Sequence, residues 1–211
     1  MIYAPQKHHR RSLRLEDYNY AHSGAYFITI VAQNRQCIFG EVVNGKIELN
    51  QFGHILAEEW EKSETIRQEI ELDAFVVMPN HIHGIVIMNS DVGATGRSPV
   101  RSGPTKRSVG ALIAGFKSVI TKRINQLRST PGMPIWQRNY YEHVIRNEAS
   151  LNRIRQYILN NPARWAFDPE NPIATSPEPK DVWLASEGDQ SVLRTVEAPV
   201  APTNPNTLVG S

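Results

Sequence analysis

Cysteine is nearly absent from this chain of 211 residues, which contains only Cys37. A single thiol excludes both a disulfide framework and a cysteine-rich zinc site within the chain. Long apolar runs are also missing, because each run is far shorter than the roughly 20 residues that cross a membrane. The N-terminal residues lack the apolar segment of a secretory signal. We therefore expect a cytoplasmic protein that does not enter a membrane.

Acidic residues are missing from one long segment, residues 92–141, which contains no Asp or Glu. The net charge of the whole chain is only +2, so this segment stands out as basic. Such asymmetry is typical of a face that binds a polyanion, and the alternative is a solvated helix face with chance clustering. The cations that we expect to contact the polyanion are Arg10, Arg11, Arg14, Lys106, Arg107, Lys117, Lys122, Arg123 and Arg138.

The apolar pattern predicts alternating strands and helices. We expect strands at residues 25–31, 72–78 and 81–88 and within 135–145, a hairpin turning at residues 44–45, and helices over residues 51–68, 109–127 and 147–161. The order is strand, helix, strand, strand, helix, strand, followed by an extra helix. This order predicts an α+β fold of the ferredoxin-like, split βαβ type, with an antiparallel sheet and helices on one face.

Two histidines lie two residues apart in the apolar strand predicted at residues 81–88. Successive side chains of a strand point to opposite faces, so His81 and His83 emerge together on one face. Buried imidazoles without partners are costly. The pair is therefore either hydrogen-bonded within the core or binds a cation, and this segment alone leaves both interpretations open.

The last predicted helix favours the interpretation that the histidine pair binds a cation. Its apolar stripe is Leu151, Ile154 and Ile158, and Tyr157 and Asn161 lie one turn apart along the edge of that stripe. If this helix packs against the histidine strand, two imidazoles, an amide oxygen and a phenol converge. Three ligands with open positions are typical of a catalytic metal site. Imidazole and amide oxygen suit Mg²⁺ or Mn²⁺, although histidines also suit zinc.

Three segments of the chain resemble the REP-associated tyrosine transposases, the single-tyrosine branch of the HUH nucleases. They are residues 77–84, 136–147 and 154–162, and residues 10–15 and 25–29 resemble the N-terminal portion of these proteins. The resemblance covers roughly residues 10–167. It divides the chain into a basic N-terminal arm (1–24), an HUH transposase-like catalytic domain (25–166) and an acidic, proline-rich tail (167–211) that we expect to be disordered.

The resemblance implies a transposase that nicks and rejoins single-stranded DNA with Mg²⁺ or Mn²⁺. His81, His83 and Asn161 would be the metal ligands, and Tyr157 the nucleophile. Attack on a backbone phosphate would leave a 5′-phosphotyrosine and a free 3′-hydroxyl, and another 3′-hydroxyl could reverse the step. The expected substrate is a palindromic DNA hairpin. The resemblance also implies no small-molecule cofactor, a monomer rather than a dimer, and a nucleoid-associated location in the cytoplasm.

Some alternatives stay open. Tyr140 and Tyr141 are rival nucleophiles, but both lie in a predicted strand near Trp136, where aromatic packing is the ordinary explanation. A DNA-hairpin-binding regulator without catalytic activity is a second function, and a metal hydrolase of small phosphoesters is a third. The presence of all four site residues favours the nuclease over the regulator. The long basic segment disfavours a small substrate.

Overall fold

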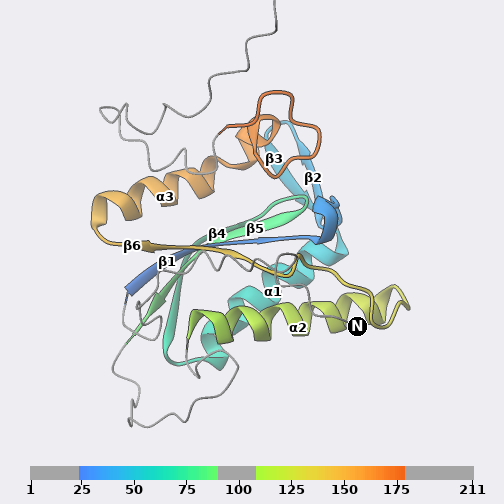
Figure 1. Cartoon of the computed structure of the whole chain (residues 1–211), viewed down its shortest axis with the longest axis horizontal. Helices are drawn as coiled ribbons and strands as arrows, with labels where there is room; N and C mark the ends of the chain where they lie inside the picture. The colour runs from blue at the N-terminus through green and yellow to red at the C-terminus, as the bar shows by residue number, and fades with distance from the viewer. Residues whose placement is uncertain (1–23, 90–107, 179–211) are drawn as a thin grey trace, which may run out of the picture.

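The computed structural model describes residues 24–89 and 108–178 (Figure 1). Its strands are β1 (Gly24–Val31), β2 (Gly40–Val43), β3 (Lys46–Leu49), β4 (Ile70–Val77), β5 (His81–Met88) and β6 (Tyr141–Ile145). Its helices are α1 (Gln51–Ile66), α2 (Val109–Leu127) and α3 (Glu148–Asn160), with the 3-10 helices η2 (Gln33–Arg35) and η3 (Pro162–Phe167). None of the helices in these two ranges combines the length and apolar character that crossing a bilayer requires.

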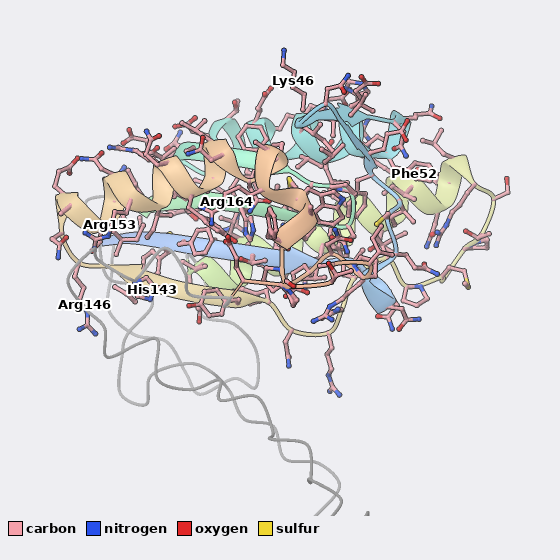
Figure 2. All side chains as sticks on the ribbon, turned by 90° about the horizontal axis from the view of Figure 1, so that it is seen from above. Lys46, Phe52, His143, Arg146, Arg153 and Arg164 are labelled. Carbon is pink, nitrogen blue, oxygen red and sulfur yellow. The ribbon has the colours of Figure 1, made fainter. Side chains whose placement is uncertain are left out.

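Four strands form one antiparallel sheet in the order β4-β5-β1-β6. Helices α1 and α2 cover one face of this sheet, and α3 lies across the other (Figures 1 and 2). The predicted ferredoxin-like α+β class, with an additional C-terminal helix, is confirmed. A separate hairpin, β2-β3, turns at Asn44 and Gly45 as predicted, and their positive φ angles of 52° and 74° are those of a type I′ turn.

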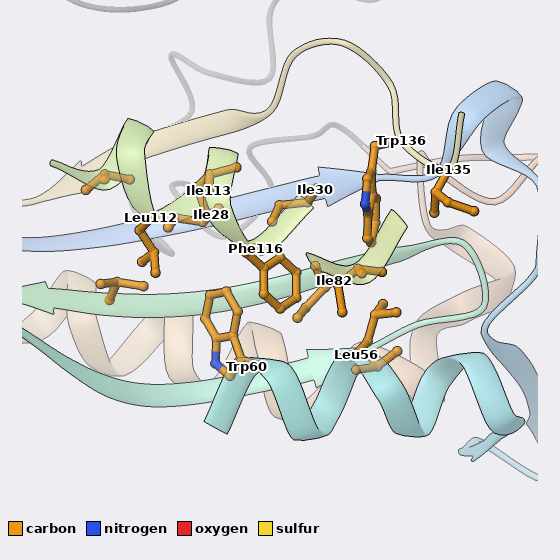
Figure 3. Close-up of a cluster of buried hydrophobic side chains, with 14 of the residues drawn as sticks. Ile28, Ile30, Leu56, Trp60, Ile82, Leu112, Ile113, Phe116, Ile135 and Trp136 are labelled. Atoms are coloured by element: carbon orange, nitrogen blue, oxygen red, sulfur yellow. The ribbon is translucent and has the colours of Figure 1, made fainter. Parts of the chain in front are cut away.

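The sheet has a core on each face because the central strands β1 and β5 are covered on both sides. On the first face Ile28, Ile30 and Ile82 pack with aromatic side chains of α1 and α2 (Figure 3). On the second face a smaller cluster joins α3 to the sheet. It consists of Phe27, Ile85, Ile145, Ile154 and Ile158.

Side-chain caps fix where the helices begin. The side-chain oxygen of Asn50 accepts hydrogen bonds from the N–H groups of Phe52 and Gly53 at the start of α1. Asn147 caps α3 in the same way, by accepting from the N–H of Ser150. The N-cap of α3 lies directly after β6, so this helix turns back over the sheet of its own chain.

The tail from residue 167 is expected to be disordered, but its first part, up to Glu178, makes defined contacts in the structure. Asp168, Glu170 and Asn171 are buried, and the amide of Asn171 donates to the carbonyl of Trp165. These polar contacts produce no apolar periodicity, which is why the sequence pattern does not reveal them. The remainder of the predicted tail, residues 179–211, lies outside the described residues, as do the predicted N-terminal arm up to residue 23 and residues 90–107.

Candidate active site

His81 and His83 stand side by side at the start of β5, on the face that α3 covers. Their side chains are buried, and their Nε2 atoms lie 3.0 Å apart. Nδ1 of His83 lies 2.8 Å from the hydroxyl oxygen of Thr29, which is opposite His83 on the neighbouring strand β1. The strand alternation that predicted a shared face for the two imidazoles is confirmed.

Asn80 determines which nitrogen of His81 carries the proton. The amide nitrogen of Asn80 donates to the carbonyls of Arg35 and Glu170, at 3.0 and 2.7 Å, so its oxygen faces His81. That oxygen lies 2.8 Å from Nδ1 of His81 and can only accept a hydrogen bond. The neutral ring of His81 therefore carries its proton on Nδ1, and its Nε2 lone pair points toward His83.

Two oxygen atoms with no hydrogen-bond partner are buried at the same site. One is Oδ1 of Asn161, at the C-cap of α3, and the other is Oδ2 of Asp168. Oδ2 of Asp168 lies 3.8 Å from Nε2 of His81, and His81, His83 and Asp168 offer ligand atoms within 4.8 Å of one another. Buried oxygens without partners are costly, which suggests that a bound group satisfies them.

This donor set fits a divalent cation. Two neighbouring ligands of an octahedral cation, each about 2.1 Å from it, lie about 3 Å apart, which matches the separation of the two Nε2 atoms. Two imidazoles with carboxylate or amide oxygens suit Mn²⁺, Mg²⁺ or Zn²⁺. Thr29 and Asn80 supply the hydrogen bonds to the far side of each ring that ligating histidines ordinarily have.

Tyr157 completes the site from α3. Its hydroxyl lies 3.4 Å from Nε2 of His83, and the two rings are 5.2 Å apart. Phe27 holds the phenol edge-on at 6.0 Å, within the small cluster beneath α3. The phenol and the imidazole pair therefore come from one chain, and the sequence-based placement of Tyr157 beside His83 agrees with this geometry.

Burial shifts the pKa values of three ionisable groups that face the site: His83, Tyr157 and Asp168. It lowers the pKa of His83 well below the ordinary value, and the neighbouring His81 adds to this effect. Burial also raises the pKa of Tyr157, as does the negative charge of Asp168, while Asn161 acts in the opposite direction. Burial raises the pKa of Asp168 as well. A cation would favour the anionic forms of both oxygens.

The rival tyrosines occupy different places. Tyr140 packs with the core beneath α1 and α2, and its hydroxyl donates to Glu142 at 2.9 Å. Tyr141 lies opposite Thr29 on β6 and packs edge-on against Phe27, at 6.2 Å, on the same face as α3. Tyr157 is the tyrosine for which a hydroxyl contact with the histidine pair is observed.

Sequence reasoning missed three residues of this site. Asp168 falls in the predicted tail, although it follows Asn161 by only seven positions. Asn80 falls between two predicted strands, although an amide directly before a histidine pair can orient the neighbouring imidazole. Thr29 carried no signal, because its role depends on strand register.

The predicted DNA-binding cations are divided among several environments. Lys117 on α2 is partly buried and donates to the carbonyls of Gln137 and Asn139, at 2.9 and 2.8 Å. Arg123 forms ion pairs with Glu58 and Glu59 of α1. Lys122 and Arg138 are exposed. The remaining predicted contacts lie outside the described residues: Arg10, Arg11, Arg14, Lys106 and Arg107.

Helix α2 lies on the face of the sheet opposite α3 (Figure 1), and the histidine pair is on the α3 face, where His83 contacts Tyr157. A DNA strand that contacts both α2 and Tyr157 would therefore have to pass around the edge or the end of the sheet. Viewed from the α3 side, three labelled arginines lie in or next to α3: Arg146, Arg153 and Arg164 (Figure 2).

No family model matches the chain. It is 38% identical over 168 residues to an uncharacterized protein of Haemophilus influenzae (strain ATCC 51907 / DSM 11121 / KW20 / Rd), with 76% of this chain and 92% of that protein covered. A solved REP-associated tyrosine transposase bound to a REP hairpin matches with 21% identity and a TM-score of 0.52, over 72% of this chain and 74% of that chain. A candidate transposase from Deinococcus radiodurans has 16% identity and a TM-score of 0.40, over 70% of this chain and 97% of that chain.

The first likeness is close enough to show common family membership. The second shows a common fold. The chain therefore belongs to the family of the Haemophilus influenzae protein and has the fold of a REP-associated tyrosine transposase.

Proposed function

We propose that this protein is a REP-associated tyrosine transposase: a metal-dependent nuclease and strand-transferase for single-stranded DNA, with Tyr157 as its nucleophile. The observation that carries the proposal is the hydroxyl of Tyr157, 3.4 Å from one of two buried, facing imidazoles. The solved protein of the same fold is bound to a REP hairpin, which supports hairpin DNA as the substrate class.

His81, His83 and an oxygen of Asp168 or Asn161 would hold the metal. When bound there, Mg²⁺ or Mn²⁺ polarises a phosphoryl oxygen and stabilises the negative charge that develops on the phosphate. Oδ2 of Asp168 lies 3.8 Å from Nε2 of His81, which supports Asp168 as an alternative to Asn161, the oxygen ligand that the resemblance implies. Asn161 lies beside both Tyr157 and Asp168, where it can bind the metal or orient the phenol.

The reaction is an in-line displacement at a backbone phosphate. Oη of Tyr157 forms a bond to phosphorus as the bond from phosphorus to the 3′ oxygen breaks. The phenol proton is lost, and a proton is gained by the departing 3′ oxygen. The products are a 5′-phosphotyrosine and a free 3′-hydroxyl. Attack by a 3′-hydroxyl on this linkage restores Tyr157 and joins the strands without another energy source.

A non-catalytic regulator that binds DNA hairpins is the second candidate. Burial raises the pKa of Tyr157, and a phenol that keeps its proton is a weak nucleophile. The site therefore depends on a cation or a base to activate this hydroxyl. A chain whose site does not bind a cation would keep the fold and a DNA surface without cutting.

A single assay separates these functions. We would incubate end-labelled hairpin DNA and Mn²⁺ with the wild type, Tyr157→Phe and Tyr141→Phe, the last being a matched tyrosine on the same face of the sheet. The proposal predicts a covalent adduct with the wild type and Tyr141→Phe, and none with Tyr157→Phe. Binding without cleavage by the wild type would instead identify a regulator. Cleavage that persists in Tyr157→Phe would indicate attack by water or by another tyrosine.

A further inference from the structure

A bidentate ion pair joins α3 to the edge strand β4. Nε of Arg155 lies 3.0 and 3.1 Å from the two carboxylate oxygens of Asp73, and Nη2 lies 2.6 Å from Oδ2. The Asp73 carboxylate is mostly buried, with 16% of its side chain exposed. Bidentate pairs of this kind fix orientation as well as distance.

Both partners are held in place by their own elements. Asp73 lies where the register between β4 and β5 shifts, between Leu72 and Phe75, and its Oδ1 accepts from the N–H of Ala74. Nη1 of Arg155 donates to the side chain of Asn152, one turn earlier on α3. The irregularity in β4 therefore presents a fixed carboxylate to a fixed guanidinium.

The apolar contacts of α3 do not determine its rotation with the same precision. Its buried residues are Ile154 and Ile158, which rest on a small cluster, and apolar burial is non-directional. A rotation of a helix by about 20° moves a point on its side-chain surface by about 2 Å. Arg155 lies two residues before Tyr157, so a rotation that it prevents would displace the phenol directly.

We propose that the Asp73–Arg155 ion pair is a positioning clasp that sets the orientation of α3 and so holds the Tyr157 hydroxyl beside His83. This inference rests on the proposed function of Tyr157 as a nucleophile. Neither Asp73 nor Arg155 contacts the histidine pair in the described contacts, so the clasp acts through the helix. A misplacement of about 1 Å at a reacting atom can cost about a hundredfold in rate.

The kinetic test compares Asp73→Asn and Arg155→Gln with Glu59→Gln. The control weakens a matched ion pair of 2.6 Å, between Arg123 and Glu59, on the other face of the sheet. With saturating hairpin DNA and Mn²⁺, we expect the single-turnover rate of adduct formation to fall at least tenfold in both clasp variants and to stay within twofold in the control. The dissociation constants for DNA and Mn²⁺ should stay within twofold. Equal rates in all variants would overturn the clasp.

A second readout does not depend on catalysis. In protein labelled with 3-fluorotyrosine, the ¹⁹F resonance of Tyr157, assigned with Tyr157→Phe, should shift or broaden in Asp73→Asn but not in Glu59→Gln. An unchanged resonance would contradict the clasp. If the wild type forms no adduct and this resonance still moves, the proposed function fails and the clasp stands. The double variant Asp73→Arg, Arg155→Asp should recover part of the wild-type signal.

Discussion

The side-chain oxygen of Asn80 lies 2.8 Å from Nδ1 of His81, and neither side chain is exposed to solvent. The same amide donates to the carbonyl of Glu170, so a single side chain links the histidine strand to the segment that carries Asp168. Asn80 thereby joins two parts of the site that are far apart in the sequence.

Asn80→Ala should weaken metal binding without removing a ligand. Without the Asn80 side chain, the proton of the neutral His81 ring could move from Nδ1 to Nε2. The loss of such a supporting group typically lowers metal affinity by about 10–100-fold. Titration calorimetry with Mn²⁺ measures the affinity, and ¹⁵N NMR of the imidazole reports the tautomer. Asn160→Ala, at an exposed position on α3, is the control. An unchanged tautomer and affinity in Asn80→Ala would disprove the orienting role.

Asp168→Asn should have opposite effects on stability without and with metal. Because the folded pKa of Asp168 is raised, its ionisation destabilises the fold as the pH rises through that pKa. The variant should therefore be more stable than the metal-free wild type by about 1 kcal/mol at about pH 7.5, and this gain should shrink in acid.

With Mn²⁺ at a hundredfold excess over the dissociation constant, the wild type should gain about 2.7 kcal/mol. Asp168→Asn should gain clearly less, because it loses an anionic ligand. Thermal unfolding at two pH values, with and without Mn²⁺, measures both effects. An equal metal-dependent gain in the two proteins would leave Asn161 as the oxygen ligand in place of Asp168.

Lys117 should lose its proton at mildly alkaline pH. Burial lowers its pKa to about 8. Between this value and its unfolded pKa the unfolded state binds more protons, so the contribution of Lys117 to stability rises with pH. The free energy of unfolding of the wild type should therefore increase relative to Lys117→Gln between about pH 8 and about pH 10. Lys122→Gln, at an exposed position, should follow the wild type; a Lys117→Gln curve parallel to both would contradict the shift.

The same substitution at two glycines should have opposite effects on stability. A Cβ at Gly84 would lie 2.4 Å from the ring of Trp60, so Gly84→Ala should destabilise the fold by about 1–3 kcal/mol. The nearest atom to a Cβ at Gly115, in α2, is 3.7 Å away, and Gly115→Ala should stabilise the helix by about 0.5–1 kcal/mol. Chemical denaturation measures both. A neutral Gly84→Ala would show that the Trp60 ring can move aside.

Much of the fold follows from local sequence signals. The helix predicted at residues 109–127 is found as α2 (Val109–Leu127), because its apolar residues recur at helical spacing. The strand predicted at residues 81–88 is found as β5, and the Asn44-Gly45 turn has the expected backbone angles. These features depend on neighbouring residues, which periodicity and turn chemistry describe well.

Several residues of the candidate site, in contrast, come together only through contacts between distant segments. The position of Thr29 beside His83 requires the register of β1 and β5, and Asp168 reaches His81 through a segment without periodicity. Lys117 and Arg123 are predicted DNA contacts, and in the structure their side chains also contact carbonyls and carboxylates of their own chain. Charge runs do not reveal which cations are already paired.

We propose that the phenol beside the paired imidazoles is the group that becomes bonded to DNA. The most direct test is to digest the protein–DNA adduct formed with Mn²⁺ and locate the linkage by mass spectrometry. We predict a single peptide linked to DNA, with the phosphate attached to Tyr157. A metal chelator should prevent this adduct from forming. A linkage on Tyr140 or Tyr141, or hairpin cleavage with every tyrosine unmodified, would contradict the account.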